Sequence, residues 1–289
     1  SLLDSNWYMA KCILMFHMPF FFFISGYCYK NNPNHKLYRK KNLIKTFKII
    51  AIIGILSFPF YILKDLLQGQ FAIKKIVMYM GDFFYGNSIN NHTFGGGYWF
   101  IVTMLICKLL FDVLCEAKIN TIRINAAFLC LLLIISPLIN IAEISILPFC
   151  IDNVKFAIIF YISGYIIKES GIVKKIQENK YRDKLTLIIV CLFLVLLVST
   201  YYNSSLVLMY KNQYGNYMLF YVGSFAGIFL LIALSMKITI LKKFFLYFGD
   251  TLWFFLMQFY ILDVVISIAI RIIADNMYVE SAFVFIVTT

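Results

Sequence analysis

Long apolar segments separated by clusters of basic residues are the feature that most restricts how this chain folds. Candidate membrane spans lie at about residues 12–29, 47–63, 98–115, 123–139, 154–167, 185–202, 217–236 and 251–270, and a shortened one begins near residue 281. A bilayer core of about 30 Å takes about 20 apolar helical residues per crossing. With 62% hydrophobic and 14% charged residues, the chain is also too apolar for a water-soluble domain of 289 residues. The sequence therefore predicts an all-α fold, a polytopic transmembrane helical bundle that forms one domain over residues 1–289.

Lysine and arginine residues alternate between the two sets of loops that these spans create. The loops after the first, third, fifth and seventh spans hold 18 of them, whereas the other loops hold 6. Basic loops stay in the cytoplasm according to the positive-inside rule. We therefore expect residue 1 on the extracytoplasmic side of a multi-pass protein. The same distribution accounts for the net charge of +12, so no nucleic-acid partner is expected.

Both ends of the sequence predict that the chain is part of a longer protein. A chain that starts outside needs an earlier span to carry it there, and this one starts with Ser1 rather than Met. At the other end, an apolar run stops after a few residues. We expect about ten spans in the complete protein, of which eight or nine are present.

The seven cysteines lie in or beside apolar segments, with no C-x-x-C pair and no histidine at metal-ligand spacing. We expect them to be small packing side chains, and we expect no metal.

The segment from Phe16 to Tyr27 contains the two residues that fit least well in a lipid-facing helix. His17 is ionisable, and such a group needs a cavity or a polar partner in a membrane, which makes it a candidate functional residue. Lys30 follows 13 residues later, so His17 lies about 20 Å from the cytoplasmic edge. Pro19 cannot donate the helical hydrogen bond to Met15 O. The segment predicts either a kinked helix that lines a polar cavity or a kinked packing helix with one hydrogen-bonded histidine.

This segment resembles the second transmembrane segment of acyltransferase family 3, whose members are membrane O-acyltransferases that commonly acetylate cell-surface polysaccharides and glycans. The resemblance rests on Phe16-His17-Met18-Pro19, the following phenylalanine run, Ser25-Gly26-Tyr27 and the basic loop after them. Three weaker motifs extend it over roughly residues 12–260: Tyr98-Trp99-Phe100, Ile162-Ser163-Gly164-Tyr165 and Phe248-Gly249-Asp250-Thr251-Leu252. It implies a transferase of the bacterial cell envelope, in the cell membrane, with acyl-CoA (acetyl-CoA) as the donor.

The chain departs from the family pattern in two places. The resemblance implies a catalytic histidine in the first transmembrane helix of the family, and this sequence does not contain that helix. The last motif is often followed by a histidine, whereas this chain has Gln258. We therefore expect the principal histidine upstream of Ser1 and a supporting catalytic role for His17. We also expect the 289-residue chain alone to be inactive.

Other polar residues are candidates for binding the acceptor. The polar stretch 81–97 suits a carbohydrate acceptor, although most such loops are only solvated connections. In the spans, a polar residue is a candidate for lining the substrate path. The candidates for acceptor binding are Asn91, His92, Trp99, Gln258 and Asp263.

The basic residues after the first span are candidates for binding the donor. Arg39, Lys40 and Lys41 suit the phosphates of coenzyme A, although the positive-inside rule already explains their presence. Because His35 lies among these basic residues, we expect it to be a solvated surface histidine. Lys108 and Asp112 are four residues apart on one helix face, which predicts an ordinary pair near the membrane edge or, less simply, part of a donor vestibule.

The function that the resemblance implies is transfer of an acyl group, acetyl above all, from cytoplasmic acyl-CoA to a hydroxyl of an extracytoplasmic or lipid-linked saccharide. The membrane and this saccharide are then its partners. The alternative is a transporter or flippase of glycans or lipids, which often shows internal repeats with broken helices. Here the match of residues 162–165 to the first motif is too short to indicate a repeat. A membrane sensor without catalysis is a third alternative.

Overall fold

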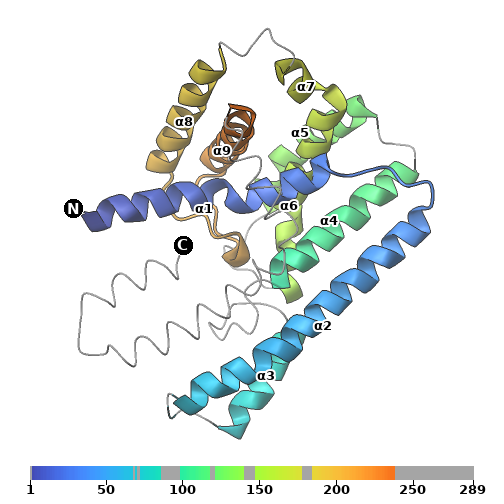
Figure 1. Ribbon diagram of the computed structural model, residues 1–289, viewed down its shortest axis with the longest axis vertical. Coiled ribbons are helices and arrows are strands. Elements are labelled where there is room, and N and C mark those ends of the chain that lie inside the picture. The colour runs from blue at the N-terminus through green and yellow to red at the C-terminus, as the bar shows by residue number, and fades with distance from the viewer. Residues whose placement is uncertain are drawn as a thin grey trace.

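The computed structural model describes residues 2–67, 69, 72–85, 98–117, 121–139, 147–177 and 184–237, and within them it is all-helical apart from one isolated bridge between Leu208 and Gln213. The α-helices are α1 (Leu2–Tyr27), α2 (His35–Leu67), α3 (Ile73–Tyr85), α4 (Tyr98–Glu116), α5 (Ile122–Ile139), α6 (Val154–Ser170), α7 (Ile172–Gln177), α8 (Leu185–Tyr202) and α9 (Tyr217–Lys237) (Figure 1). Two short 3₁₀ segments, η2 (Pro148–Asn153) and η3 (Met209–Lys211), precede α6 and α9.

The predicted spans that fall within these residues are all helical, which confirms the all-α prediction. Among the described residues, three segments are both long and apolar enough to cross a bilayer: Tyr8–Tyr27, Leu185–Tyr202 and Tyr217–Lys237. Ile122–Leu138 is apolar but shorter. The spans predicted at 251–270 and from residue 281 lie outside the described residues.

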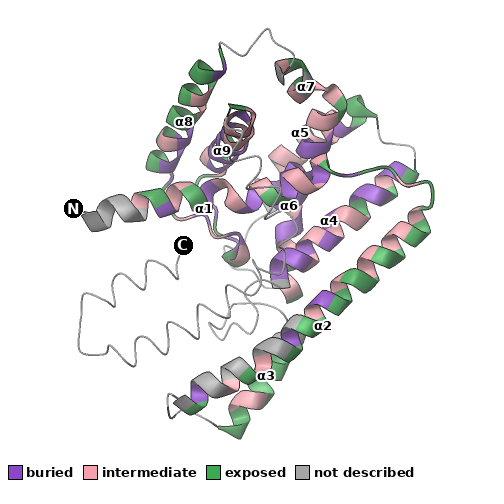
Figure 2. Ribbon diagram, in the orientation of Figure 1, coloured by how far each residue is buried: buried purple, intermediate pink, exposed green. Residues whose placement is uncertain are grey.

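The outer side of α8 shows which solvent this bundle requires. Leu187, Phe193 and Leu194 are each about half exposed, at 65%, 49% and 53% (Figure 2). A water-soluble helix would place polar residues on its exposed side, but α8 contains no charged residue. Lipid is the solvent for which such a surface is stable. The chain is accordingly an integral membrane protein.

Two glycines allow α1 and α6 to cross with their backbones in contact. A β-carbon on Gly26 would overlap the backbone of Tyr161, and one on Gly164 would overlap the backbone of Phe23. Close approach at small residues is the usual way in which membrane helices pack. The contact is reciprocal, because each glycine meets the residue three positions before the other glycine.

The two crossing segments are also alike in sequence. Residues 22–27 read FFISGY and residues 160–165 read FYISGY. Their other neighbours differ, since α9 and α8 pack on α1, whereas α5 and α4 pack on α6. The short sequence match therefore lies at the crossing itself, and that it is too short to indicate a repeat stays a prediction.

Pro19 is accommodated by a hydrogen bond from a neighbouring helix. Ser224 on α9 donates its hydroxyl to Met15 O at 2.7 Å, and both residues are fully buried. Met15 O is the carbonyl that the proline leaves without its helical donor. The carbonyl that the proline leaves free thus has its hydrogen-bond donor on α9.

The connecting segments gather at two ends of the bundle. One end, here called the basic end, is formed by residues 28–34, the start of α2, the end of α4 and the end of α6. The other end, here called the opposite end, is formed by η2, η3 and residues 203–216. Hydrogen bonds join segments within each end: Lys168 Nζ donates to Tyr29 O at the basic end, and Tyr214 OH donates to Asn153 Oδ1, at 2.8 Å, at the opposite end.

Candidate functional site

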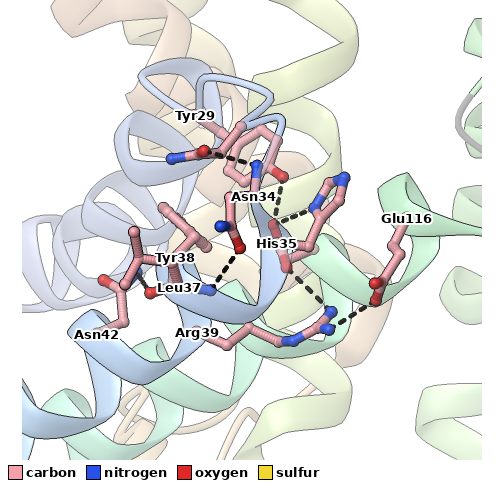
Figure 3. Close-up of polar contacts among 10 residues, drawn as sticks. Tyr29, Asn34, His35, Leu37, Tyr38, Arg39, Asn42 and Glu116 are labelled. Atoms are coloured by element: carbon pink, nitrogen blue, oxygen red, sulfur yellow. Dashed lines mark hydrogen bonds and ion pairs between the residues drawn. The ribbon is translucent and has the colours of Figure 1, made fainter.

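A buried carboxylate at the basic end is the centre of a polar network. Asp112 on α4 is fully buried, and three side chains from the α1–α2 region donate hydrogen bonds to it. Tyr29 OH and His35 Nδ1 lie 2.9 and 3.0 Å from Oδ1, and an Arg39 guanidinium nitrogen lies 3.1 Å from Oδ2 (Figure 3). Charge-assisted bonds of this kind are the strong ones in proteins, and they supply the partners that a buried charge requires.

Local sequence explains why these donors face α4. Asn34 caps α2, since its Oδ1 accepts a hydrogen bond from Leu37 N at 3.0 Å, and α2 therefore begins at His35. His35 and Arg39 are four residues apart and lie on one face of α2. Asp112 and Glu116 have the same spacing at the end of α4, so the two pairs oppose each other (Figure 3).

Arg39 spans both acidic residues of α4. One guanidinium nitrogen binds Asp112 and the other lies 2.6 Å from Glu116 Oε2. The hydrogen bond to Glu116 is the main reason why the pKa of Arg39 lies above its ordinary value. The Arg39 side chain therefore links α2 to α4, whereas the neighbouring Lys40 and Lys41 are exposed.

Tyr29 extends the network to α6. Its ring packs against Phe111 and Tyr165 at centroid distances of 5.1 and 6.1 Å, and its backbone carbonyl accepts the Lys168 ammonium. Burial raises the pKa of Tyr29, and hydrogen bonds to Cys115 and Asp112 raise it further, so its hydroxyl remains a neutral donor. The site thus ties together the ends of α1, α2, α4 and α6.

Two sequence predictions about this region are wrong. Asp112 binds Tyr29, His35 and Arg39 rather than Lys108, because it faces the start of α2. His35 is not a solvated surface residue, since its side chain is only 16% exposed and bonds Asp112. The signal available in the sequence was the pair of matching four-residue spacings after a capping asparagine, but nothing in it showed which helices would meet.

His17 lies on the face of α1 that the described helices leave most open. Ile13 and Phe21, one turn to either side, are 46% and 40% exposed. The other faces of α1 pack on α6, α8 and α9. His17 Nδ1 lies 3.2 Å from Ile13 O. Since a carbonyl can only accept, Nδ1 carries the hydrogen in this contact, and the Nε2 of the neutral ring keeps a free lone pair. This is the form in which a histidine acts as a base.

Of the other predicted acceptor-binding residues, the structure describes Trp99. Trp99 is buried at the start of α4 beside Phe100, whose ring lies 5.8 Å from that of Phe21. Phe100 thus joins the start of α4 to Phe21, which is one turn from His17 on α1. The remaining predicted acceptor-binding residues, Asn91, His92, Gln258 and Asp263, lie outside the described residues.

Comparison with known proteins bears on the family of this chain and not on its individual residues. No curated protein and no solved structure matches the chain. A family model described as an acyltransferase domain matches residues 3–289, which is almost the whole sequence. A match of this extent means that the chain, an integral membrane protein, belongs to acyltransferase family 3.

Proposed function

We propose that this acyltransferase transfers an acyl group, acetyl above all, from cytoplasmic acyl-CoA to a hydroxyl of an extracytoplasmic or lipid-linked saccharide. The distribution of Lys and Arg supports an orientation in which the basic end faces the cytoplasm. In this proposal the acyl donor enters from the basic end, the acceptor enters from the opposite end, and their reacting groups meet between the two ends. Family membership supports acyl transfer, and the two ends supply different chemistry for the two substrates.

The basic end suits an anionic donor. Lys40 and Lys41 are exposed beside the start of α2 and are free to meet the phosphates of coenzyme A. Arg39 has a different role, because Asp112 and Glu116 already hold its guanidinium. In this proposal Arg39 keeps the start of α2 against α4, and the flanking lysines attract the donor.

His17 is the group that serves the acceptor hydroxyl. In the reaction a base takes the hydroxyl proton, the oxygen forms a bond to the thioester carbonyl carbon, the carbon–sulfur bond breaks, and the proton ends on the thiol of coenzyme A. His17 supports this proton transfer through its free Nε2. The observation that carries the proposal is the contact of Nδ1 with Ile13 O on the open face of α1, because it leaves Nε2 unprotonated in the neutral ring.

Substitution of His17 in the complete gene product tests the proposal. Membrane vesicles are given acetyl-CoA with a labelled acetyl group, and the label in the glycan is measured per folded molecule. His17→Ala should lower transfer about 10²–10⁴-fold. His17→Gln should lower it too, because an amide keeps a hydrogen bond but exchanges no proton near neutral pH. Normal transfer by both variants would assign His17 to packing. Absence of any labelled glycan in the wild type would favour the transporter alternative.

A further inference from the structure

The reciprocal crossing of α1 and α6 sets up a comparison between their outer parts. Gly26 corresponds to Gly164, and nine residues before each glycine stand His17 and Lys155. Nine helical residues cover about 13.5 Å, so both ionisable side chains stand at the same distance from the crossing on their own helix. Lys155 is the second residue of α6 and therefore belongs to the opposite end.

Lys155 has an unusual environment for a cation on a membrane helix. Its side chain is half-buried, and its ammonium lies 5.4 Å from the centre of the Phe156 ring. Within the described part of the chain, the ammonium makes no hydrogen bond and no ion pair. Asp152 is the acidic group that acts on it electrostatically. Because Asp152 acts on it without forming an ion pair, the ammonium is able to bind a further anionic group.

A second donor without a partner lies two residues away. Asn153 is fully buried, and its Oδ1 accepts the hydroxyl of Tyr214 at 2.8 Å. Its Nδ2 has no hydrogen-bond partner among the described residues. Buried polar groups are nearly always hydrogen-bonded, so this amide has a donor that the oxygen of a bound group would satisfy.

The two donors lie against the same pair of aromatic rings. The rings of Phe156 and Tyr214 are 4.1 Å apart between centroids. Lys155 lies over the Phe156 ring, and Asn153 is bonded to Tyr214. Tyr214 is itself fixed, because its carbonyl accepts a hydrogen bond from Asn203 at 3.1 Å. The donors are thus mounted on a packed part of the opposite end rather than on a free loop.

We infer that Lys155 and Asn153 bind a phosphate group at the opposite end of the bundle. A phosphate offers several acceptor oxygens, so it can satisfy an ammonium and an amide together. Two sources supply this chemistry near a membrane surface: the headgroup of a phospholipid and the phosphate that joins a saccharide to its lipid carrier. The second source rests on the proposed function and assigns a lipid-linked acceptor to it. Phosphate binding itself does not depend on acyl transfer.

The test measures the thermal stability of the purified complete protein in detergent with and without phosphate probes. The probes are glucose 1-phosphate, with glucose as the neutral control, and phosphatidylglycerol in mixed micelles. We expect glucose 1-phosphate or phosphatidylglycerol to raise the midpoint of unfolding. Lys155→Gln should weaken this response about tenfold or more in apparent Kd, because one charge-assisted hydrogen bond is lost. Lys211→Gln is the matched control, since Lys211 is exposed and also lies over a tyrosine ring, that of Tyr210.

A substitution of Asn153 separates ligand binding from folding. Asn153→Asp keeps an oxygen for the Tyr214 hydroxyl but places a negative charge at the free donor, so it should abolish the phosphate response. A response to glucose 1-phosphate and not to glucose supports a saccharide phosphate, and a response to phosphatidylglycerol alone supports a lipid headgroup. Equal responses of Lys155→Gln and Lys211→Gln would overturn the site, as would a wild-type protein that responds to neither probe. A wild-type protein that responds to phosphate but transfers no acyl group would refute only the proposed function and leave the phosphate site standing.

Discussion

Replacement of Asp112 by asparagine tests whether the buried network holds the basic end together. Asparagine has nearly the same size, and its oxygen still accepts a hydrogen bond, so the variant removes charge rather than volume. Tyr29 OH and His35 Nδ1 then donate to a neutral oxygen instead of a carboxylate. Any loss of stability therefore reports the charge.

The expected loss follows from the two contacts of Oδ1. A hydrogen bond to a charged group contributes about 1.5–3 kcal/mol and a neutral one about 1 kcal/mol. Each bond is then weakened by about 0.5–2 kcal/mol, so the two together lower the free energy of unfolding by about 1–4 kcal/mol. In chains of this order of size, 1 kcal/mol shifts the unfolding midpoint by about 2–4 °C, so a decrease of about 2–16 °C is expected. Arg39 is omitted from this sum because its guanidinium also reaches Glu116 and solvent.

Thermal unfolding of the detergent-solubilised protein measures the effect, and Glu116→Gln is the matched control. Glu116 has a side chain that is 44% exposed, so water screens its pair with Arg39 and the midpoint should change little. Tyr29→Phe provides a cycle, because Asp112→Asn should cost less once the Tyr29 hydroxyl is gone. An Asp112→Asn variant as stable as the wild type, or no less stable than Glu116→Gln, would refute the reasoning.

Two further predictions concern the packing of α1. Gly26→Ala and Gly164→Ala should each lower stability by about 3 kcal/mol and reduce the yield of monodisperse protein, because the new methyl group meets backbone; Gly81→Ala, with no atom within 4 Å, should not. Equal yields for all three would contradict the crossing. Ser224→Ala should lower the free energy of unfolding by about 1 kcal/mol in the wild type. In a Pro19→Ala background the same change should cost almost nothing, because the restored N–H of residue 19 donates to Met15 O. Additive losses in this double-mutant cycle would show that the Ser224 hydrogen bond does not compensate for Pro19.

The helices were predictable because hydropathy and length decide them locally. The segment predicted at 98–115 is α4 at Tyr98–Glu116, and that at 185–202 is α8 with the same bounds. The segment predicted at 47–63 is only part of α2, which starts at His35 because Asn34 caps it. A basic stretch carries no apolar signal, so the sequence showed where α2 is apolar and not where it begins.

The candidate site was less predictable because its contacts join distant residues. Pro19 showed that Met15 O needs a donor, yet Ser224 lies 209 residues from Met15. Asp112 was visible as a charge on an apolar helix, yet its donors lie 73 to 83 residues away. A sequence can show that a buried polar group requires a partner. Only the packing of the helices determines which partner it has.

The matched crossing segments explain how one packing unit can serve two different substrates. Near the basic end, α1 and α6 keep the same I-S-G-Y residues, because close backbone contact allows no larger side chain at Gly26 or Gly164. Farther along each helix no such contact constrains the sequence, and the residues diverge to His17 on α1 and Lys155 on α6. A neutral base suits a hydroxyl, whereas a cation suits a phosphate. In these two proposals the crossing of α1 and α6 supplies the geometry, and the different residues nine positions before each glycine separate proton transfer from anchoring of the acceptor.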